Sequence, residues 1–174
     1  MKRPQLEHAL RAAGSLSGCR DLVVIGSQAL LASHPDAPED LLRSMEVDLY
    51  PRDEPEKADL IDGCIGELSP FHEAFGYYVH GVGPETAVLP AGWRSRLVRV
   101  ETQETGGTVG WCLSPLDLAV SKLVAGRRKD LDFVRGMLRA GFLESSHVAS
   151  VGAELSPEIA HLVIARLASC LRSE

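Results

Sequence analysis

The stretch "SMEVDLY" (residues 44–50) alternates in polarity with the two-residue period of a β-strand. Residues two apart in a strand point to the same face, so Glu46 and Asp48 share one face and the apolar residues share the other. Two carboxylates ~7 Å apart repel each other unless a positive group lies between them. This face is therefore either simply exposed to solvent or part of a Mg²⁺ site, because hard divalent ions bind carboxylate oxygens and complete their shell with water and substrate phosphates.

A second feature lies upstream, in "DLVVIGSQALL" (residues 21–31). A buried strand that ends on Gly26 and runs into a short helix at Ser27 exposes backbone N–H groups and a hydroxyl, which together can bind phosphate. An ordinary strand-to-helix turn with a serine cap is the alternative. The order along the chain favours a phosphate site, because the carboxylate pair follows on the next strand.

The rest of the chain predicts a mixed α/β core followed by helices. Helices are expected at residues 4–13, 54–68, 115–125, 128–140, 144–151 and 157–172, and further strands at residues 76–82, 86–89, 96–101 and 108–113. Gly14 is expected to end the first helix, and Ser114 to cap the first C-terminal one. We predict an α/β (α+β) fold, a small mixed β-sheet flanked by helices. Its core covers residues 1–113, and a helical C-terminal subdomain over residues 114–174 packs on it as one compact unit.

The composition is that of a folded, acidic protein. Of the 174 residues, 45% are hydrophobic and 24% are charged, which excludes wholesale disorder. The net charge of −6 and the pI near 5.5 exclude nucleic-acid binding as a property of the whole surface. An RNA contact would need a local basic patch, and the two candidates are otherwise ordinary solvated surface. These patches are Arg94, Arg96 and Arg99, and Arg127, Arg128 and Lys129.

The four cysteines lie far apart and lack the spacing of a zinc site. We expect Cys19, Cys64, Cys112 and Cys170 to be buried apolar residues in a reducing cytosol. The N-terminus lacks the apolar segment of a signal peptide, and no apolar run is long enough to span a membrane. A soluble, cytoplasmic protein without a membrane partner is therefore expected.

Three segments together resemble a known family. "IGSQALL" (25–31) followed by "RSMEVDLY" (43–50) is similar to the nucleotidyltransferase superfamily that includes DNA polymerase beta, in which Gly-Ser at a helix start precedes an Asp-x-Asp strand. "LSPLDLAVSKLVAGRRKDLDFV" (113–134) resembles the helical segment of the AbiEii-type toxin nucleotidyltransferases and of an allied bacterial branch. The resemblance covers roughly residues 20–140. It implies a nucleotidyltransferase-like fold with a helical C-terminal part.

The resemblance also implies a function and site residues. Gly26 and Ser27 would hold the triphosphate oxygens of an NTP, and Glu46 and Asp48 would ligate Mg²⁺. The expected reaction moves an NMP group from the NTP to a hydroxyl of RNA, protein or a small molecule, with Asp48 as the base for that hydroxyl. Candidate partners are tRNA or another RNA, and, for a toxin–antitoxin component, a protein antitoxin.

Lys122 and Asp130 are the site residues that the helical segment implies, Lys122 against phosphate charge and Asp130 as a further active-site carboxylate. On one continuous helix they would lie ~12 Å apart, whereas a break at Gly126 would let two helices turn both side chains to one cleft. The alternatives are an ordinary surface lysine and a first-turn carboxylate that favours the helix dipole. Asp117, near the Ser114 cap, fits the dipole role better.

Two departures from the family pattern leave a second function open. Glu46 stands where the family usually has Asp, which changes the reach to an octahedral ion. The third carboxylate of polymerase-type enzymes has no clear counterpart. Glu101 is the only candidate on a strand, and an exposed strand-end acid is its other interpretation. The alternative is therefore a nucleotidyltransferase-like binding or regulatory module that has lost the chemistry.

The remaining polar residues give weaker predictions. His72, His80 and His147 lie on separate elements without metal-ligand spacing, so surface or capping roles are expected. The segment "GVGPETAVLPAGWRSR" (81–96) is expected to border a binding cleft.

Overall fold

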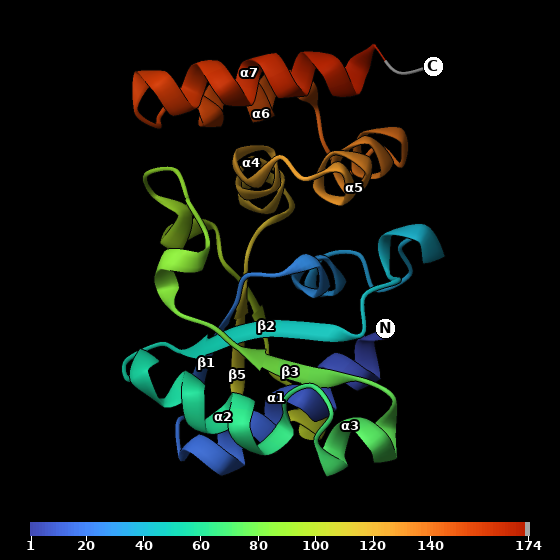
Figure 1. Ribbon diagram of the computed structural model, residues 1–174, viewed down its shortest axis with the longest axis vertical. Coiled ribbons are helices and arrows are strands. Elements are labelled where there is room, and N and C mark those ends of the chain that lie inside the picture. Colours follow the sequence, from blue (N-terminus) through green and yellow to red (C-terminus); the bar gives the residue numbers. More distant parts are fainter. Residues whose placement is uncertain (173–174) are drawn as a thin grey trace.

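The computed structural model describes residues 1–172, and its centre is a five-stranded mixed sheet (Figure 1). The strands are β1 (Asp21–Val24), β2 (Glu46–Pro51), β3 (Tyr78–Gly81), β4 (Val98–Val100) and β5 (Val109–Cys112). They follow the order β3-β2-β1-β5-β4 across the sheet. The central strand β1 is antiparallel to β2 and parallel to β5, while β3 pairs parallel with β2 and β4 pairs antiparallel with β5. The predicted mixed sheet is confirmed.

Helices cover both faces of this sheet. The α-helices are α1 (Arg3–Ser17), α2 (Ala58–Ile65), α3 (Pro70–Phe75), α4 (Pro115–Ala125), α5 (Arg128–Arg139), α6 (Ser145–Gly152) and α7 (Pro157–Leu171). The 3₁₀ helices are η1 (Ser27–Ala32), η2 (Glu39–Leu41), η3 (Pro55–Lys57), η4 (Pro84–Thr86), η5 (Trp93–Arg96) and η6 (Gln103–Thr105). In Figure 1, α1, α2 and α3 lie on one side of the sheet and α4 to α7 lie on the other, with α7 outermost. The predicted helical C-terminal region is confirmed.

The two faces of β2 differ as the alternation of its sequence predicts. Val47 and Leu49 are fully buried in the core that α1 and α2 form with the sheet, whereas Glu46 and Asp48 lie on the opposite face, toward η1 and α4. Hydrophobic burial on one side thus fixes which side receives the two carboxylates, because a shift of one residue would exchange the faces.

Two hydrophobic clusters hold the molecule together. One fills the space between the sheet and its helices, and the other lies among the C-terminal helices. Helix α4 contributes to both, with Leu118 in the first cluster and Leu123 in the second. The division into subdomains at residue 114 stays a prediction. Within residues 1–172, none of the helices has the length and apolarity needed to cross a membrane.

The first helix is longer than predicted. Gly14 was expected to end it, but α1 continues to Ser17 and closes on Gly18, which has the left-handed conformation of a C-cap (φ 69°). Gly14 has a packing role instead, because a Cβ atom there would lie 2.2 Å from Oγ1 of Thr108. The glycine thus marks a close approach inside the helix, and the predicted end was wrong.

Two further predictions need correction, and one helix was missed. Residues 86–89 are not a strand, since η4 ends at Thr86 and an irregular segment follows. The helix predicted over 54–68 is the shorter pair η3 and α2, which ends before Gly66. Helix α3 was not predicted, although Ser69-Pro70 provides the same start signal as Ser114-Pro115, and the Ser69 hydroxyl accepts the N–H of His72.

The cysteines follow the prediction only in part. All four are free, and Cys112 and Cys170 are buried. Cys64 is exposed and Cys19 is half-buried, so burial was wrongly predicted for these two.

Candidate functional site

Glu46, Asp48 and His80 form one group on the sheet face that looks toward α4. One potential ligand atom from each lies within 4.8 Å of the other two. Nδ1 of His80 is 2.9 Å from Oδ1 of Asp48, and the hydroxyl of Tyr78 donates to Oε2 of Glu46 at 3.1 Å. The parallel register of β2 and β3 explains both contacts, because it sets Glu46 opposite Tyr78 and Asp48 opposite His80.

The prediction for His80 was incomplete. Its side chain is 48% exposed, but it contacts Asp48 and does not cap a helix. One signal was present in the sequence: the Tyr-Val-His triplet at 78–80 places two polar rings on one strand face, with the same spacing as Glu46 and Asp48. What the sequence lacks is the pairing of β3 with β2, and that pairing brings the two polar faces together.

Gly26 is required beside Asp48 for steric reasons. A Cβ atom on Gly26 would lie 1.9 Å from Oδ2 of Asp48, so any other residue would push the carboxylate out of its place. The backbone conformation of Gly26 is ordinary (φ −82°), and close approach alone explains the glycine. Nearby, the N–H of Ile25 donates to the carbonyl of Asp48 at 3.0 Å, which ties the end of β1 to β2.

Ser27 begins η1 directly after this contact. The N–H of Ala29 returns to the carbonyl of Gly26 at 3.0 Å, and the N–H groups at the start of a helix have no partner within it. Gln28 is fully buried, and its Nε2 donates to the carbonyl of Ser44 at 2.9 Å. Helix η1 is therefore fixed to the segment that leads into β2, with its first residues at the site.

Lys122 and Asp130 meet across a helix break. Helix α4 ends at Ala125, Gly126 takes the left-handed conformation (φ 66°), and α5 begins at Arg128. Nζ of Lys122 is 3.0 Å from Oδ1 of Asp130, and Nε of Arg127 is 2.6 Å from Oδ2 of the same carboxylate. The break at Gly126 is thus present, and it turns both side chains to one place.

Asp130 is buried under these two cations, since its side chain has no exposed area. Burial alone would raise its pKa, but the hydrogen bond from Arg127 and the charge of Lys122 outweigh burial, and the pKa of Asp130 lies below its ordinary value. Asp130 also raises the pKa of Arg127 through their hydrogen bond. Asp130 is thus a partner of Lys122, and it is not an acid free to bind an ion.

Asp48 is in the opposite electrostatic state. Burial raises its pKa first and the neighbouring charge of Glu46 raises it further, while His80 and Lys122 offset only part of this rise. Burial and Glu46 also raise the pKa of Tyr78 to about 12, so its hydroxyl remains a proton donor to Glu46. His80 and Lys122 thus compensate the Glu46–Asp48 pair only in part.

Two cavities open on this group. The larger, about 560 Å³, is lined by residues of η1, η2, the segment before β2, α4 and α5, among them Ser27, Phe133 and Asp130. The smaller, about 220 Å³, is lined by Gly26, Asp48 and His80 and by Thr86 and Ala87 of the 81–96 segment. That segment does border a cavity. Glu46, Lys122 and Lys129 line both cavities, whereas Asp48 lines only the smaller one.

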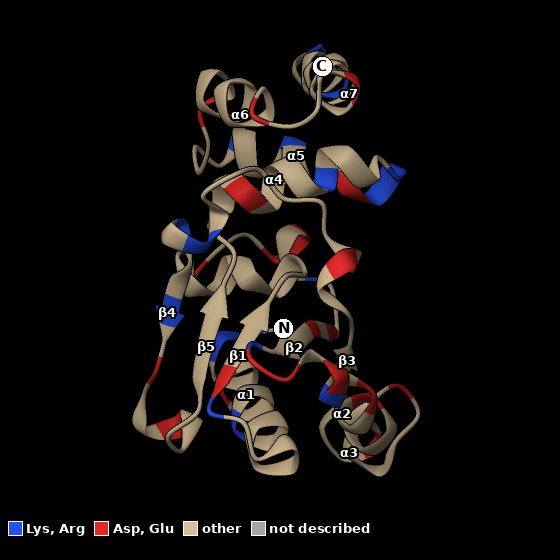
Figure 2. Ribbon diagram, turned by 90° about the vertical axis from the view of Figure 1, so that its left-hand side faces the viewer, with Lys and Arg blue, Asp and Glu red and all other residues tan. Residues whose placement is uncertain are grey.

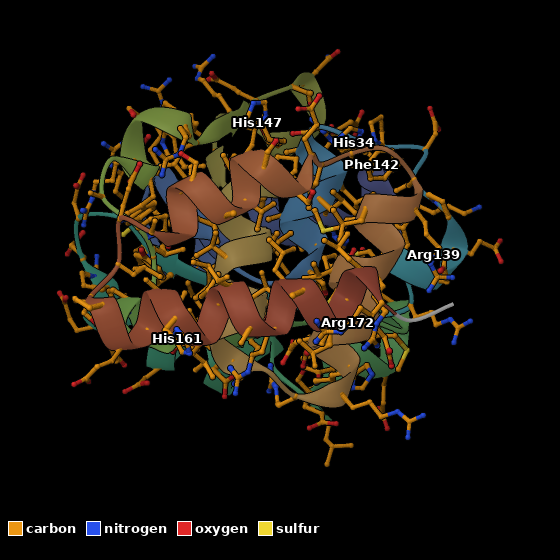
Figure 3. All side chains as sticks on the ribbon, turned by 90° about the horizontal axis from the view of Figure 1, so that it is seen from above. His34, Arg139, Phe142, His147, His161 and Arg172 are labelled. Atoms are coloured by element: carbon orange, nitrogen blue, oxygen red, sulfur yellow. The ribbon has the colours of Figure 1, made fainter. Side chains whose placement is uncertain are left out.

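An aromatic stack links the segment after η1 to the end of α5. His34, from the segment after η1, stacks on Phe142, just beyond α5, with ring centroids 3.8 Å apart and planes 12° from parallel. Figure 3 shows these two residues together at one end of the helical layer. The contact ties the segment that carries η2 to the end of α5, so two walls of the larger cavity are held at a fixed separation.

The basic residues named from the sequence have different surroundings. Arg96 pairs with the buried Asp117 at 2.6 Å, and Asp117 also accepts the hydroxyl of the cap residue Ser114, so this arginine has a structural role. Arg127 and Lys129 line the smaller cavity. Figure 2 shows basic and acidic segments side by side along α5, where the second patch lies.

Glu101 does not join the Glu46–Asp48–His80 group among the described residues. It lies just beyond β4 and pairs with Arg20 and Arg99. The interpretation as an exposed strand-end acid fits its place but not its surroundings, because only a quarter of the side chain is exposed and two arginines pair with it. The third donor beside the carboxylate pair is the imidazole of His80.

The donor set fits a divalent cation. Two carboxylates and an imidazole within 4.8 Å are ligands that such ions accept, and Gly26 leaves the space that Asp48 occupies. The cation would supply the charge that the carboxylate pair lacks, because Lys122 and Arg127 make their close ion pairs with Asp130.

Residues 5–151 of the chain match the protein family DUF6036, described as a nucleotidyltransferase of unknown function. The match covers both the sheet and the Lys122–Asp130 segment, and it supports the superfamily in the predicted resemblance without showing the AbiEii-type branch. Comparison with curated proteins gave no match, and comparison with solved structures gave none either. Since the matched region is most of the chain, the protein belongs to the DUF6036 family of nucleotidyltransferases.

Proposed function

We propose that the protein is a Mg²⁺-dependent nucleotidyltransferase that moves an NMP group from an NTP to a hydroxyl of RNA, a protein or a small molecule. The observation that carries the proposal is that Glu46 and Lys122 line both cavities, with Asp48 beside Glu46 in the smaller one. Two cavities that meet at one charged wall suit a reaction between two bound substrates.

The NTP is assigned to the larger cavity. Its volume of about 560 Å³ is within the range for small-molecule sites. Lys122 would contact the phosphates as a compact cation, and the N–H groups that begin η1 at Ser27 would contact them from the other side. Phe133 supplies an aromatic wall for the base.

Glu46 and Asp48 would hold the Mg²⁺, with His80 as a third donor. The ion neutralises phosphate charge when bound. The chain's own contribution is to fix the two carboxylates: Tyr78 donates to Glu46, His80 contacts Asp48, and Gly26 leaves room for Asp48. The ion pair with Asp130 likewise holds the ammonium group of Lys122 in place.

The acceptor hydroxyl is assigned to the smaller cavity, which His80, Thr86 and Ala87 border. Asp48 is the base for this hydroxyl. Burial and the charge of Glu46 raise its pKa toward the range where a carboxylate takes up a proton more readily. Nδ1 of His80, 2.9 Å from Oδ1 of Asp48, would donate to this carboxylate and hold it in place for the acceptor hydroxyl.

A second function follows from the donor set itself: a nucleotide-binding or regulatory module without transfer activity. Glu46 replaces the usual Asp, and among the described residues the third donor of the group is a histidine. Such a site would bind a nucleotide and leave the α-phosphate unreacted.

The test is transfer of label. The protein is incubated with Mg²⁺ and each α-labelled NTP, with and without total tRNA, beside Asp48→Ala and Lys122→Ala. Transfer that both substitutions abolish supports the enzyme. A nucleotide-induced thermal shift without transfer supports the module, and neither signal rejects both functions.

A toxin role with a protein antitoxin is a finer proposal, suggested by the AbiEii-like segment 113–134. We expect growth arrest on expression in a bacterial host, and no arrest with Asp48→Ala. Growth unaffected by an active enzyme would reject the toxin role and leave the transferase proposal standing.

A further inference from the structure

The geometry points to Arg166 of α7 as a positioning residue for Lys122. Through Arg166, α7 would hold the junction of α4 and α5 beside the proposed nucleotide site. This inference rests on the proposed function, because it assigns Arg166 a role toward the lysine that would contact phosphate. Helix α7 lies outside residues 5–151, the part that matches the family.

The first observation is what Arg166 binds. Its Nη1 donates to the carbonyls of Leu123 and Val124, at 2.7 and 2.6 Å. Both carbonyls belong to the last turn of α4, where a helix leaves carbonyls without partners inside the helix. A guanidinium at that end also interacts favourably with the helix dipole. Arg166 therefore closes the end of α4 from a helix more than forty residues away.

The second observation is where the guanidinium lies. A Cβ atom on Gly126 would be 2.1 Å from Cζ of Arg166, so the guanidinium covers the glycine of the helix break. Lys122 lies one turn before the break and Asp130 one turn after it, and their 3.0 Å contact depends on the angle between α4 and α5. Arg166 thus contacts the segment that joins α4 to α5 and sets that angle.

The third observation is that α7 contacts both sides of the break. Leu167 packs in the cluster that contains Leu123 of α4 and Val134 of α5. Sγ of Cys170 contacts the carbonyl of Leu131 in α5 at 3.7 Å. Figure 1 shows α7 lying across the outside of α4 and α5. Apolar packing holds α7 against both helices, and Arg166 supplies the directional contact that sets their junction.

We expect Arg166→Met, which keeps the aliphatic chain and removes the donors, to loosen the Lys122–Asp130 contact. The direct measurement is the rate at which an amine-reactive reagent modifies Lys122, followed by mass spectrometry with the exposed Lys129 as internal reference. In the wild type, Lys122 is paired and only 17% exposed. Its modification, relative to Lys129, should rise several-fold in Arg166→Met and less in Arg166→Lys, which keeps one donor group.

Two controls separate positioning from general stability. Val148→Ala truncates a buried residue of α6 in the same cluster and should lower the melting temperature without raising Lys122 modification. Arg172→Met removes an exposed arginine at the end of α7 and should change neither quantity. Equal Lys122 modification in Arg166→Met and wild type would overturn the proposal, and so would an equal rise in Val148→Ala. If Arg166→Met does not fold, Arg166→Lys is compared with the wild type instead, and unchanged Lys122 modification in that variant would overturn the proposal.

The kinetic test completes the experiment. With an active enzyme, Arg166→Met should raise KM for the NTP and lower kcat/KM by about ten- to a hundredfold, the size expected when a contact group is misplaced by about 1 Å. Millimolar guanidinium should restore part of the loss in Arg166→Met only. If the wild type transfers no nucleotide, the proposed function fails, while the modification experiment still decides whether Arg166 positions Lys122.

Discussion

Asp48 and Asp130 are both carboxylates with little or no exposure on the same side of the sheet, yet their surroundings differ in sign. Asp48 faces Glu46 and an imidazole, and its pKa is raised. Asp130 lies between Lys122 and Arg127, and its pKa is lowered. Asp130, which pairs with two cations, connects α4 to α5, whereas Asp48, which lies beside a second carboxylate, is the proposed cation ligand. Burial and acidity alone would not distinguish them.

The largest expected effect separates the two carboxylates by activity. Asp48→Ala should lower nucleotide transfer by about three orders of magnitude, the size typical of losing one preorganised electrostatic contact. Without Mg²⁺ it should leave the protein as stable as the wild type or more so, because the repulsion with Glu46 disappears. Label transfer and urea unfolding measure the two effects. A clear loss of stability in Asp48→Ala would mean that Asp48 stabilises the fold as Asp130 does, and the comparison would fail.

The next effect is on stability and falls on the other carboxylate. Asp130→Ala should cost about 3 kcal/mol of unfolding free energy, because it leaves Lys122 largely buried without its partner. Asp132→Ala is the matched control on the same helix: that acid is more than half exposed, and its loss should cost only about 0–1 kcal/mol. Equal costs for the two substitutions would show that Asp130 is not a structural partner.

A smaller effect sharpens the role of His80. His80→Ala removes the contact to Asp48 and should weaken metal-induced stabilisation by about tenfold in apparent affinity, as is usual for losing an outlying donor or orienting group. His147→Ala is the control, because the ring of His147 pairs with the exposed Glu144 at 3.6 Å, away from the Glu46–Asp48–His80 group. Titration with Mg²⁺ and Mn²⁺, followed by thermal unfolding, measures the change. Identical titrations for His80→Ala and wild type would place His80 outside the site.

The smallest effect is the pH dependence, with opposite signs for the two acids. The folded-state pKa of Asp130 is lowered, so its stabilising contribution is complete above the ordinary value of 3.8 and is lost as pH falls through its folded pKa. The folded-state pKa of Asp48 is raised, so its destabilising contribution is complete above that pKa, shrinks as pH falls, and ends below 3.8.

Unfolding of Asp48→Asn and Asp130→Asn in chelator, from neutral pH down past 3.8, tests this difference. The stability gap between Asp48→Asn and wild type should begin to shrink at a pH above 3.8, whereas the gap for Asp130→Asn should stay constant down to that pH. Gaps that close together would mean that the two carboxylates share one environment.

Local sequence was sufficient for much of the site. Alternation along 44–50 set Glu46 and Asp48 on one face, because hydrophobic burial of Val47 and Leu49 fixes the other. The break at Gly126 followed from the left-handed conformation that glycine adopts readily at a helix end. Each of these features depends on a few neighbouring residues.

The features that could not be predicted from local sequence depend on contacts between distant segments. His80 reaches Asp48 only because β3 pairs parallel with β2, after the chain has passed through α2 and α3. Arg127 could be named from its charge, but the burial of Asp130 beneath it required the packing of α5. The continuation of α1 past Gly14 likewise depends on Thr108, far along the chain, which no local pattern indicates.

The central strand β1 has a consequence for synthesis of the protein. It pairs with β5, so Asp21 lies beside Val109. During translation, roughly ten seconds pass between the synthesis of β1 and that of β5, at usual elongation rates. The nascent chain therefore has neither the complete five-stranded sheet nor the α4–α5 junction until most of it has been made. The proposed nucleotide site therefore assembles late in synthesis, because Lys122 and Asp130 meet only across that junction.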